Sequence, residues 1–205
     1  MKAALLALAL IVAFAPSVRA DEAAPEVSTP TNHVSLLLQP IGYGPSGMFS
    51  AGLIGQYWLD QRSMLVLELM RNINNVSYGD VSNGRHVDRQ GASIGAHYKR
   101  FVWGRVYLKA GLDGRTLDDK QELSGDVGSF SATSLAATFA VGTQWQNDHF
   151  TLGVDWYGYS IPLSHRYRDE VTPATSSVAS YIADDKKRVE EGWPSALRLY
   201  VGVTF

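Results

Sequence analysis

The feature that most limits what this chain can fold into is its last eleven residues, in which apolar side chains recur at every second position. These apolar positions are Leu197, Leu199, Val201, Val203 and Phe205. A period of two predicts a β-strand whose two faces meet different surroundings. The final residue is itself an apolar member of the pattern, whereas a terminal strand in a soluble protein usually trails polar residues. We therefore expect this strand to be held in a sheet along its whole length.

Residues 1–20 predict a secretory signal peptide. Lys2 is followed by an unbroken apolar run over residues 3–14, and residues 18–20 (VRA) have the form of a cleavage site. The polar, proline-containing residues 21–31 are expected to form a periplasmic N-terminal tail, and residues 32–205 a single domain. The chain contains no cysteine, which suits export through an oxidising compartment.

The composition then restricts how the mature chain could meet a membrane. Charged residues make up 19% of the chain, against about 25% in ordinary soluble domains. No segment after the signal peptide approaches the eighteen apolar residues of a spanning helix. Only a closed barrel could then cross a bilayer, because every backbone polar group must be paired there. The net charge of -2 gives no reason to expect a nucleic-acid partner.

The alternating pattern can be followed through the whole domain. It predicts eight strands, over residues 32–41, 48–59, 64–74, 90–101, 105–116, 132–146, 149–161 and 195–205. Short links at 60–63, 102–104 and 147–148 alternate with long ones at 75–89, 117–131 and 162–194, and only the link at 42–47 departs from this order. Outer-membrane barrels have short periplasmic turns and longer extracellular loops. The predicted fold is an all-β, eight-stranded antiparallel transmembrane β-barrel.

Aromatic residues gather at both ends of these predicted strands. Near the short turns lie Tyr57, Trp58, Phe101, Trp103, Trp145, Phe150 and Phe205, and near the other end lie Tyr43, Phe49, Trp156, Tyr157, Tyr159 and Trp193. The preference of aromatics for strands explains their number but not their position. Two rings are typical of the interfacial girdles of a membrane barrel.

The alternation also separates two faces. Leu65, Leu67, Leu69, Ile94, Ala96, Val106, Leu108, Ala110, Leu112, Leu152 and Val154 form the apolar set, and the opposite set contains glycines, Tyr107, Tyr157, Tyr200 and the charged residues. Charges are too few for a solvated exterior, which indicates a lumen. We predict a lumen charge network of Glu68, His97, Lys99, Lys109, Asp113, Asp155 and Arg198. The interior of an eight-stranded barrel is just wide enough for side chains to fill, so these acids and bases should pair as a structural plug. A proton or ion relay is the open alternative.

The C-terminal strand resembles the assembly signal of bacterial outer-membrane barrels, with Arg198, Val203 and Phe205 in its polar, hydrophobic and aromatic places. Tyr200 stands where that signal often has glycine. Over nearly its whole mature length the chain resembles the small eight-stranded outer-membrane β-barrels, the group of OmpX, the OmpA transmembrane domain and OmpW. The resemblance implies residence in the outer membrane of a Gram-negative bacterium. It also implies contact with lipid, lipopolysaccharide and the barrel assembly machinery.

The function expected on these grounds is structural or one of surface interaction through the extracellular links at 75–89, 117–131 and 162–194. The alternatives are a narrow channel for small or hydrophobic solutes and a lipid A-modifying enzyme. We expect no enzyme activity, cofactor or metal. His33 and Ser35 lie at the periplasmic end, and Ser164 and His165 stand so close in sequence to Asp169 and Glu170 that a catalytic geometry is not expected. The five histidines are scattered.

Overall fold

The computed structural model describes residues 34–43, 49–78, 85–123, 126–172 and 176–205. The predicted signal peptide, the predicted tail at 21–31 and His33 lie outside the described residues. Among the helices described, none is long and apolar enough to cross a membrane.

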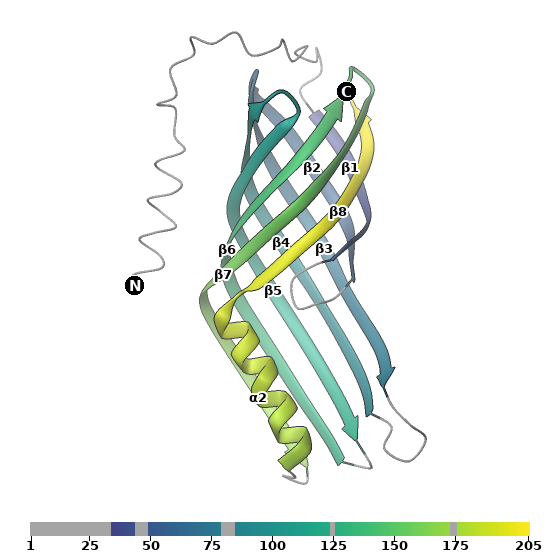
Figure 1. Cartoon of the computed structure of the whole chain (residues 1–205), viewed down its shortest axis with the longest axis vertical. Helices are drawn as coiled ribbons and strands as arrows, with labels where there is room; N and C mark the ends of the chain where they lie inside the picture. The colour runs from purple at the N-terminus through teal and green to yellow at the C-terminus, as the bar shows by residue number, and fades with distance from the viewer. Residues whose placement is uncertain (1–33, 44–48, 79–84, 124–125, 173–175) are drawn as a thin grey trace.

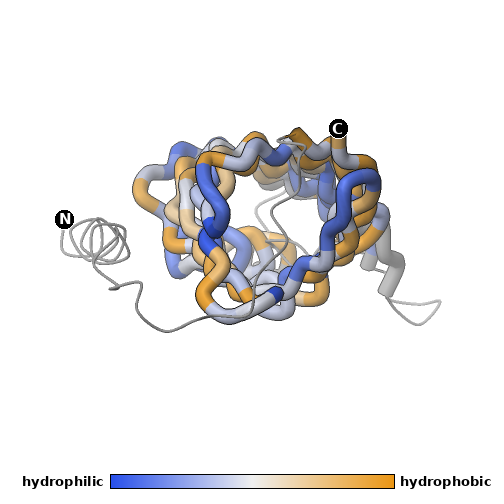
Figure 2. The backbone as a smooth tube through the Cα atoms, turned by 90° about the horizontal axis from the view of Figure 1, so that it is seen from above, coloured by the Kyte–Doolittle hydropathy of each residue, from blue (hydrophilic) through white to orange (hydrophobic). Residues whose placement is uncertain are grey.

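Eight antiparallel strands form a closed barrel in which each strand pairs with its neighbours in sequence and β8 pairs with β1. The strands are β1 (Val34–Tyr43), β2 (Phe49–Asp60), β3 (Ser63–Tyr78), β4 (Arg85–Trp103), β5 (Val106–Leu123), β6 (Asp126–Gln146), β7 (Phe150–Thr172) and β8 (Trp193–Thr204). Two backbone hydrogen bonds between Val34 and Phe205 join the first and last strands. Figure 2 shows the resulting ring. The predicted fold class and strand number are confirmed.

The short turns all lie at one end of the barrel. Residues 61–62, 104–105 and 147–149 connect β2 to β3, β4 to β5 and β6 to β7. The C-terminus is at this same end, at the top of Figure 1. Residues 61–62 form a tight turn in which the Asp60 carboxylate accepts a hydrogen bond of 2.7 Å from the Arg62 amide. Such self-bonding by Asp is a common way to stabilise a turn.

At the other end, the prediction of long loops at 75–89, 117–131 and 162–194 is wrong. β3 and β4 remain paired out to Tyr78 and Arg85, and β5 and β6 out to Leu123 and Asp126. β1, β2 and β8 have 10, 12 and 12 residues, but β6 and β7 have 21 and 23. About 9–11 residues suffice to cross a bilayer. We call residues 74–78, 85–90, 117–123, 126–132 and 161–172 the extension; these strand segments run beyond β1, β2 and β8 at the bottom of Figure 1.

Part of the remaining predicted loop is a helix, α2 (Ser176–Glu191). Its buried residues Val178, Ile182 and Val189 pack with Leu117, Phe130 and Ala132 of the extension. Because Leu117 and Phe130 are on the same side of their strands as the lumen residues, α2 lies on the inner face of the extension, as Figure 1 shows. Spacings of four, three and four along Val178, Ile182, Asp185 and Val189 are helical. The same spacing in the sequence is a signal that could have identified this helix.

The two faces of the barrel wall have the characters that the alternation predicts. Leu67 is 56% exposed and Ile94 is 67% exposed, whereas Glu68 is 5% exposed. An exterior lined with large apolar side chains is abnormal for a protein in water. The register of β3 is therefore the predicted one.

One outward residue contradicts the predicted faces. Tyr157, placed in the lumen by strict alternation, is 53% exposed on the exterior. Val141 pairs with Tyr157 while the next residue, Gly142, pairs with Asp155, so Trp156 is an extra residue in β7. Such a β-bulge shifts the alternation by one. Asp155 therefore keeps its predicted inward position, while Trp156 and Tyr157 both point outward.

Two aromatics expected in the girdle near the short turns are instead inside the barrel. Trp58 and Phe101 are each 6% exposed, and their rings stack with centroids 5.5 Å apart. Both alternate in phase with lumen residues of their strands. They lie in the lumen near the short turns, while Tyr57, Trp103 and Phe205 remain outside.

Candidate functional site

The middle of the lumen holds a compact ring of two acids and two bases. Lys109 Nζ lies 2.6 Å from Glu68 Oε1 and 2.7 Å from Asp155 Oδ2. Arg198 Nη2 lies 2.6 Å from Glu68 Oε2, and Nη1 lies 3.5 Å from Asp155 Oδ2. The four residues come from β3, β5, β7 and β8, and each is at most 7% exposed. The ring therefore joins strands that are not all neighbours in the wall.

A second group lies next to this ring. Asp113 Oδ1 is 3.1 Å from His97 Nε2, and Asp113 Oδ2 is 2.6 Å from Arg115 Nη2. The Thr138 hydroxyl also donates to Asp113. His97 Nε2 is 3.9 Å from Glu68, which connects the two groups. Arg115 was not predicted as a lumen residue, although its position two residues after Asp113 on the same strand face could have identified it.

Lys99 behaves differently from the other predicted bases. Its ammonium donates to Gln144 Oε1 at 2.8 Å and to the Tyr200 hydroxyl at 3.2 Å. It also lies 4.3 Å and 4.9 Å from the ring centroids of Tyr107 and Tyr200. The expectation that Lys99 would pair with an acid is wrong. Amide and hydroxyl oxygens, together with the negative faces of two aromatic rings, stabilise its charge instead.

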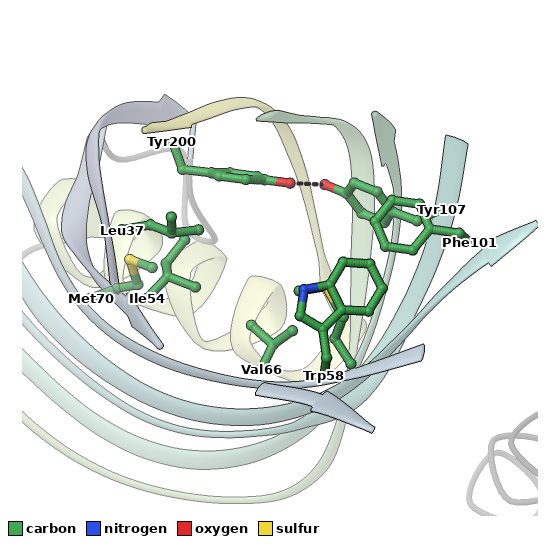
Figure 3. Close-up of a cluster of buried hydrophobic side chains, with 9 residues drawn as sticks. Leu37, Ile54, Trp58, Val66, Met70, Phe101, Tyr107 and Tyr200 are labelled. Carbon is green, nitrogen blue, oxygen red and sulfur yellow. Dashed lines mark hydrogen bonds between the residues drawn. The ribbon is translucent and has the colours of Figure 1, made fainter. Parts of the chain in front are cut away.

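Two tyrosines connect this lysine to the charge ring. The Tyr200 hydroxyl donates to the Tyr107 hydroxyl at 3.0 Å, as Figure 3 shows, and Tyr107 in turn donates to Asp155. Each ring lies over the glycine that pairs with it on the neighbouring strand, Tyr107 over Gly142 and Tyr200 over Gly153. A Cβ on Gly142 would overlap Tyr107, and one on Gly153 would overlap the Tyr200 ring. Glycine is therefore required at both positions for the tyrosines to fit across the lumen.

Buried side chains lie in the lumen at successive levels along the described strands. An apolar layer of Trp58, Met64, Val66 and Phe101 lies nearest the short turns, and Figure 3 shows part of it. The tyrosines and Lys99, then the charge ring and then the Asp113 group follow. Beyond Arg115 a cavity of about 30 Å³ separates these groups from α2. A space of this size holds about one water molecule.

A separate charge cluster fixes α2 to the extension. Arg89 Nη2 lies 2.8 Å from Asp119 and 2.7 Å from Asp185 of α2, and Gln121 donates to both carboxylates at 2.8 Å. Burial alone would lower the pKa of Arg89, but the charges of Asp119 and Asp185 raise it above its usual value. Burial alone would raise the pKa of Asp119, but the hydrogen bond with Asp185 and the charge of Arg89 lower it overall. The ionised form of Asp119 is the one that holds the helix.

The residues of the predicted C-terminal signal divide between the two faces. Arg198 and Tyr200 are buried in the lumen, whereas Val203 and Phe205 are 51% and 59% exposed on the exterior. The last strand thus contributes both to the charge ring and to the apolar outer wall.

Ser164 and His165, two residues of the possible hydrolase site, point to opposite sides of β7. In β7, Ser164 pairs with Leu135 and faces outward, while His165 pairs with Ser134 and faces α2. His165 Nε2 lies 3.8 Å from Glu190 of the helix. Within the described ranges, there is no group of three or more His, Cys, Asp or Glu residues arranged to hold a metal ion.

The chemistry available in the middle of the lumen is that of paired charges. The carboxylates of Glu68, Asp113 and Asp155 each meet at least one cation. Breaking such a buried pair is strongly unfavourable because it leaves an uncompensated charge. The arrangement is suited to holding the wall in one conformation.

No protein-family model and no curated protein matches the sequence. Among solved structures, the chain is similar to Ail, the attachment invasion locus protein of Yersinia pestis, with 15% identity over 85% of this chain and 99% of that one, and a TM-score of 0.51. Acinetobacter baumannii CarO matches with 14% identity over 84% and 97% of the chains and a TM-score of 0.48. Neisserial surface protein A (NspA) matches with 17% identity over 84% and 96% and a TM-score of 0.40. The chain has the fold of the small eight-stranded outer-membrane β-barrels.

Proposed function

We propose that this protein is an integral barrel of the Gram-negative outer membrane, with a closed lumen and a rigid extension displayed at the cell surface. The apolar exterior supports the membrane assignment, because a closed barrel with large exposed apolar residues satisfies its backbone and needs lipid around it. The short turns and the chain ends would lie in the periplasm. Lipid and lipopolysaccharide would contact the wall, and the barrel assembly machinery would read the C-terminal strand.

This orientation can be tested by labelling, since the chain has no cysteine of its own. Lys187 on α2 and Gln61 in a short turn are both exposed. A membrane-impermeant maleimide should label Lys187→Cys on intact cells. Gln61→Cys should react only after the outer membrane is opened. The reverse pattern would overturn the orientation, and labelling of both in intact cells would argue against insertion.

Side chains buried at successive levels of the lumen support the proposal of a non-conducting barrel. Among them are Trp58, Tyr107, Lys109 and Asp113. Purified protein in a planar bilayer should show no conductance steps above the lipid background, with an open porin as the positive control. Regular unitary steps would favour the alternative of a narrow channel.

The surface role rests on the extension and α2 in place of the flexible loops expected from the sequence. Five strands continue beyond β1, β2 and β8, and the helix is held by apolar packing and by the Arg89 cluster. Binding residues concentrate where a rigid scaffold presents them. The exposed outer side of α2, with Asp184 and Lys187, is part of this presented surface.

A lipid A-modifying activity is not part of the proposal. The opposite orientations of Ser164 and His165 argue against this pair as a hydrolase site, because a nucleophile and its base must come within hydrogen-bond reach. Mass spectrometry of lipid A from cells with and without the protein should give identical spectra. Loss of an acyl chain only in cells that make the protein would contradict this.

A further inference from the structure

The outer wall across β4–β7 contains an apolar groove of about 590 Å³, within the range of about 300–1,000 Å³ typical of ligand sites. Two alanines, Ala96 and Ala110, face outward there. Their cross-strand partners are larger: Ala96 pairs with Leu112, and Ala110 pairs with Tyr98 and Phe139. Small side chains between large ones leave a hollow in an otherwise even surface.

The bulge in β7 supplies one wall of this groove. Because Trp156 is an extra residue, Tyr157 points outward beside Val141. Two residues further on, Tyr159 pairs with Phe139. Tyr157, Val141, Tyr159 and Phe139 all line the groove. An aromatic wall along one side gives the groove a defined direction.

Arg100 lines the same groove near the short turns and pairs in the wall with Ser63. It points outward in phase with Ala96 and Tyr98, and it is half-buried. Over the residues that the structure describes, no ion pair joins Arg100 to a carboxylate. A cation at the edge of an apolar belt is unfavourable unless it reaches the interface or finds an anion.

The groove offers this arginine no acidic partner from another copy of the chain. Asp60 lies at the level of Arg100, because both residues pair with Ser63, but it is on β2 and outside the groove. None of the residues that line the groove is acidic, so two barrels packed groove to groove would bring no carboxylate to Arg100. A phosphate at the membrane interface provides the missing charge, and Arg binds phosphate through paired hydrogen bonds.

We propose that this groove binds an acyl chain of a glycerophospholipid from the periplasmic leaflet, with the lipid phosphate at Arg100. Four residues of strand separate Arg100 from Ala96, about 13 Å at 3.3 Å per residue. The chain would run from the interface over Ala96 and Ala110 toward the aromatic wall. This inference rests on the proposed outer-membrane residence, because it requires a leaflet at the level of Arg100.

The test uses the folded, full-length mature protein, stripped of lipid in detergent and titrated with dioleoyl phosphatidylglycerol under native mass spectrometry. The wild type should retain one lipid preferentially. Arg100→Gln should retain it about ten-fold less well, the effect of losing one charged hydrogen bond. Inorganic phosphate alone should not compete, because the acyl chain occupies most of the groove.

A matched pair of variants separates the groove from the general surface. Ala110→Phe fills the hollow and should abolish preferential retention. Gly55→Phe adds the same ring on the outside of β2, where nothing lies within 4 Å of an added Cβ, and should retain the lipid as the wild type does. Each variant's barrel is checked by its heat-dependent shift in gel mobility.

Equal retention by Ala110→Phe and Gly55→Phe would overturn the proposal, as would unchanged retention by Arg100→Gln. A protein dimer that disappears only in Ala110→Phe would replace the lipid by a second copy of the chain and also overturn it. Surface labelling at Lys187→Cys separates failure of the lipid site from failure of membrane insertion. A barrel that is correctly inserted but shows no lipid preference refutes the lipid site alone, whereas a barrel that is not inserted refutes the proposed function.

Discussion

Replacing Lys109 by methionine tests whether the charge ring stabilises the barrel. Lys109 is 3% exposed. Its ammonium lies 2.7 Å from Asp155, whereas the Arg198 guanidinium lies 3.5 Å from the same carboxylate. Methionine keeps most of the side-chain length but removes the ammonium. In this variant Glu68 keeps its ion pair with Arg198 at 2.6 Å, while Asp155 loses its nearest cation.

The magnitude follows from which charge is left uncompensated. Removing one partner of a buried pair costs about 3–5 kcal/mol. Because Arg198 and the Tyr107 hydroxyl still reach Asp155, we expect the lower end, about 3 kcal/mol of unfolding free energy. Urea-induced unfolding in lipid vesicles, followed by tryptophan fluorescence, measures this loss.

Two further variants decide the interpretation. Lys120→Met on the same strand removes an exposed lysine in the extension and should change stability by less than about 0.5 kcal/mol. Adding Asp155→Asn to Lys109→Met should recover part of the loss, with a coupling of about 1–3 kcal/mol. If Lys109→Met matched the Lys120→Met control, or if the double variant lost the plain sum of the two single effects, the ring would not be a stabilising network.

The remaining predictions concern the wall, the helix and the last residue. Leu67→Arg should lower the unfolding free energy by about 2–4 kcal/mol, as expected for a cation at the bilayer midplane; a tolerated arginine in the same vesicle assay would mean that the two faces were assigned the wrong way round. Acidification should loosen α2, because the folded-state pKa of Asp119 is below its ordinary value of 3.8: the stabilisation is present above about pH 4 and is lost as the pH falls toward the folded pKa. The protection of amides in residues 176–191, corrected for the intrinsic exchange rate at each pH, should therefore fall between pH 7 and pH 3. In Asp119→Asn, protection should already be lower at pH 7 and should respond less to acid, and an equal response in both proteins would exclude this carboxylate as the cause. Deleting Phe205 should sharply reduce the yield of inserted, heat-modifiable barrel, and normal insertion would show that the residue only ends the strand.

The sequence predicted the barrel wall well because, inside the apolar belt, each strand residue meets either lipid-like or lumen surroundings. Because of that contrast, the alternation identifies the face on which each residue lies. It places Glu68 inward and Leu67 outward, as observed. Beyond the belt the contrast disappears. The run at 118–122 (DDKQE) is polar on both faces of β5, so it reads as a loop although it is a strand.

The sequence identified most residues of the candidate site but not which of them contact one another. Period two brought the acids and bases to one face, but it could not determine which strands meet across the lumen. Lys99 therefore was paired with an acid in the prediction, whereas its partners are Gln144 and Tyr200. Tyr157 was misplaced because a single inserted residue leaves no mark in composition or spacing.

The end of the predicted strand at Pro162 is a further difference between the sequence prediction and the structure. The predicted strand over residues 149–161 stops just before Pro162, and proline lacks the amide hydrogen that a ladder requires. In the structure β8 pairs with β7 only as far as Ser160 and Trp193, and Leu163 is an extra residue relative to β6. Proline is tolerated at a strand edge next to a bulge. Its missing donor therefore does not interrupt the strand.

The extra residue in β7 also bears on how such a barrel tolerates insertions and deletions of single residues. In a regular stretch of strand, losing one residue would exchange the lumen and lipid faces for the rest of the strand. Removing Trp156 would instead leave Asp155 inside, Tyr157 outside and Gly158 inside, in plain alternation against β6. This position is a point where the gene can lose a codon without turning a strand inside out, and where an ancestor with one residue fewer could have gained it.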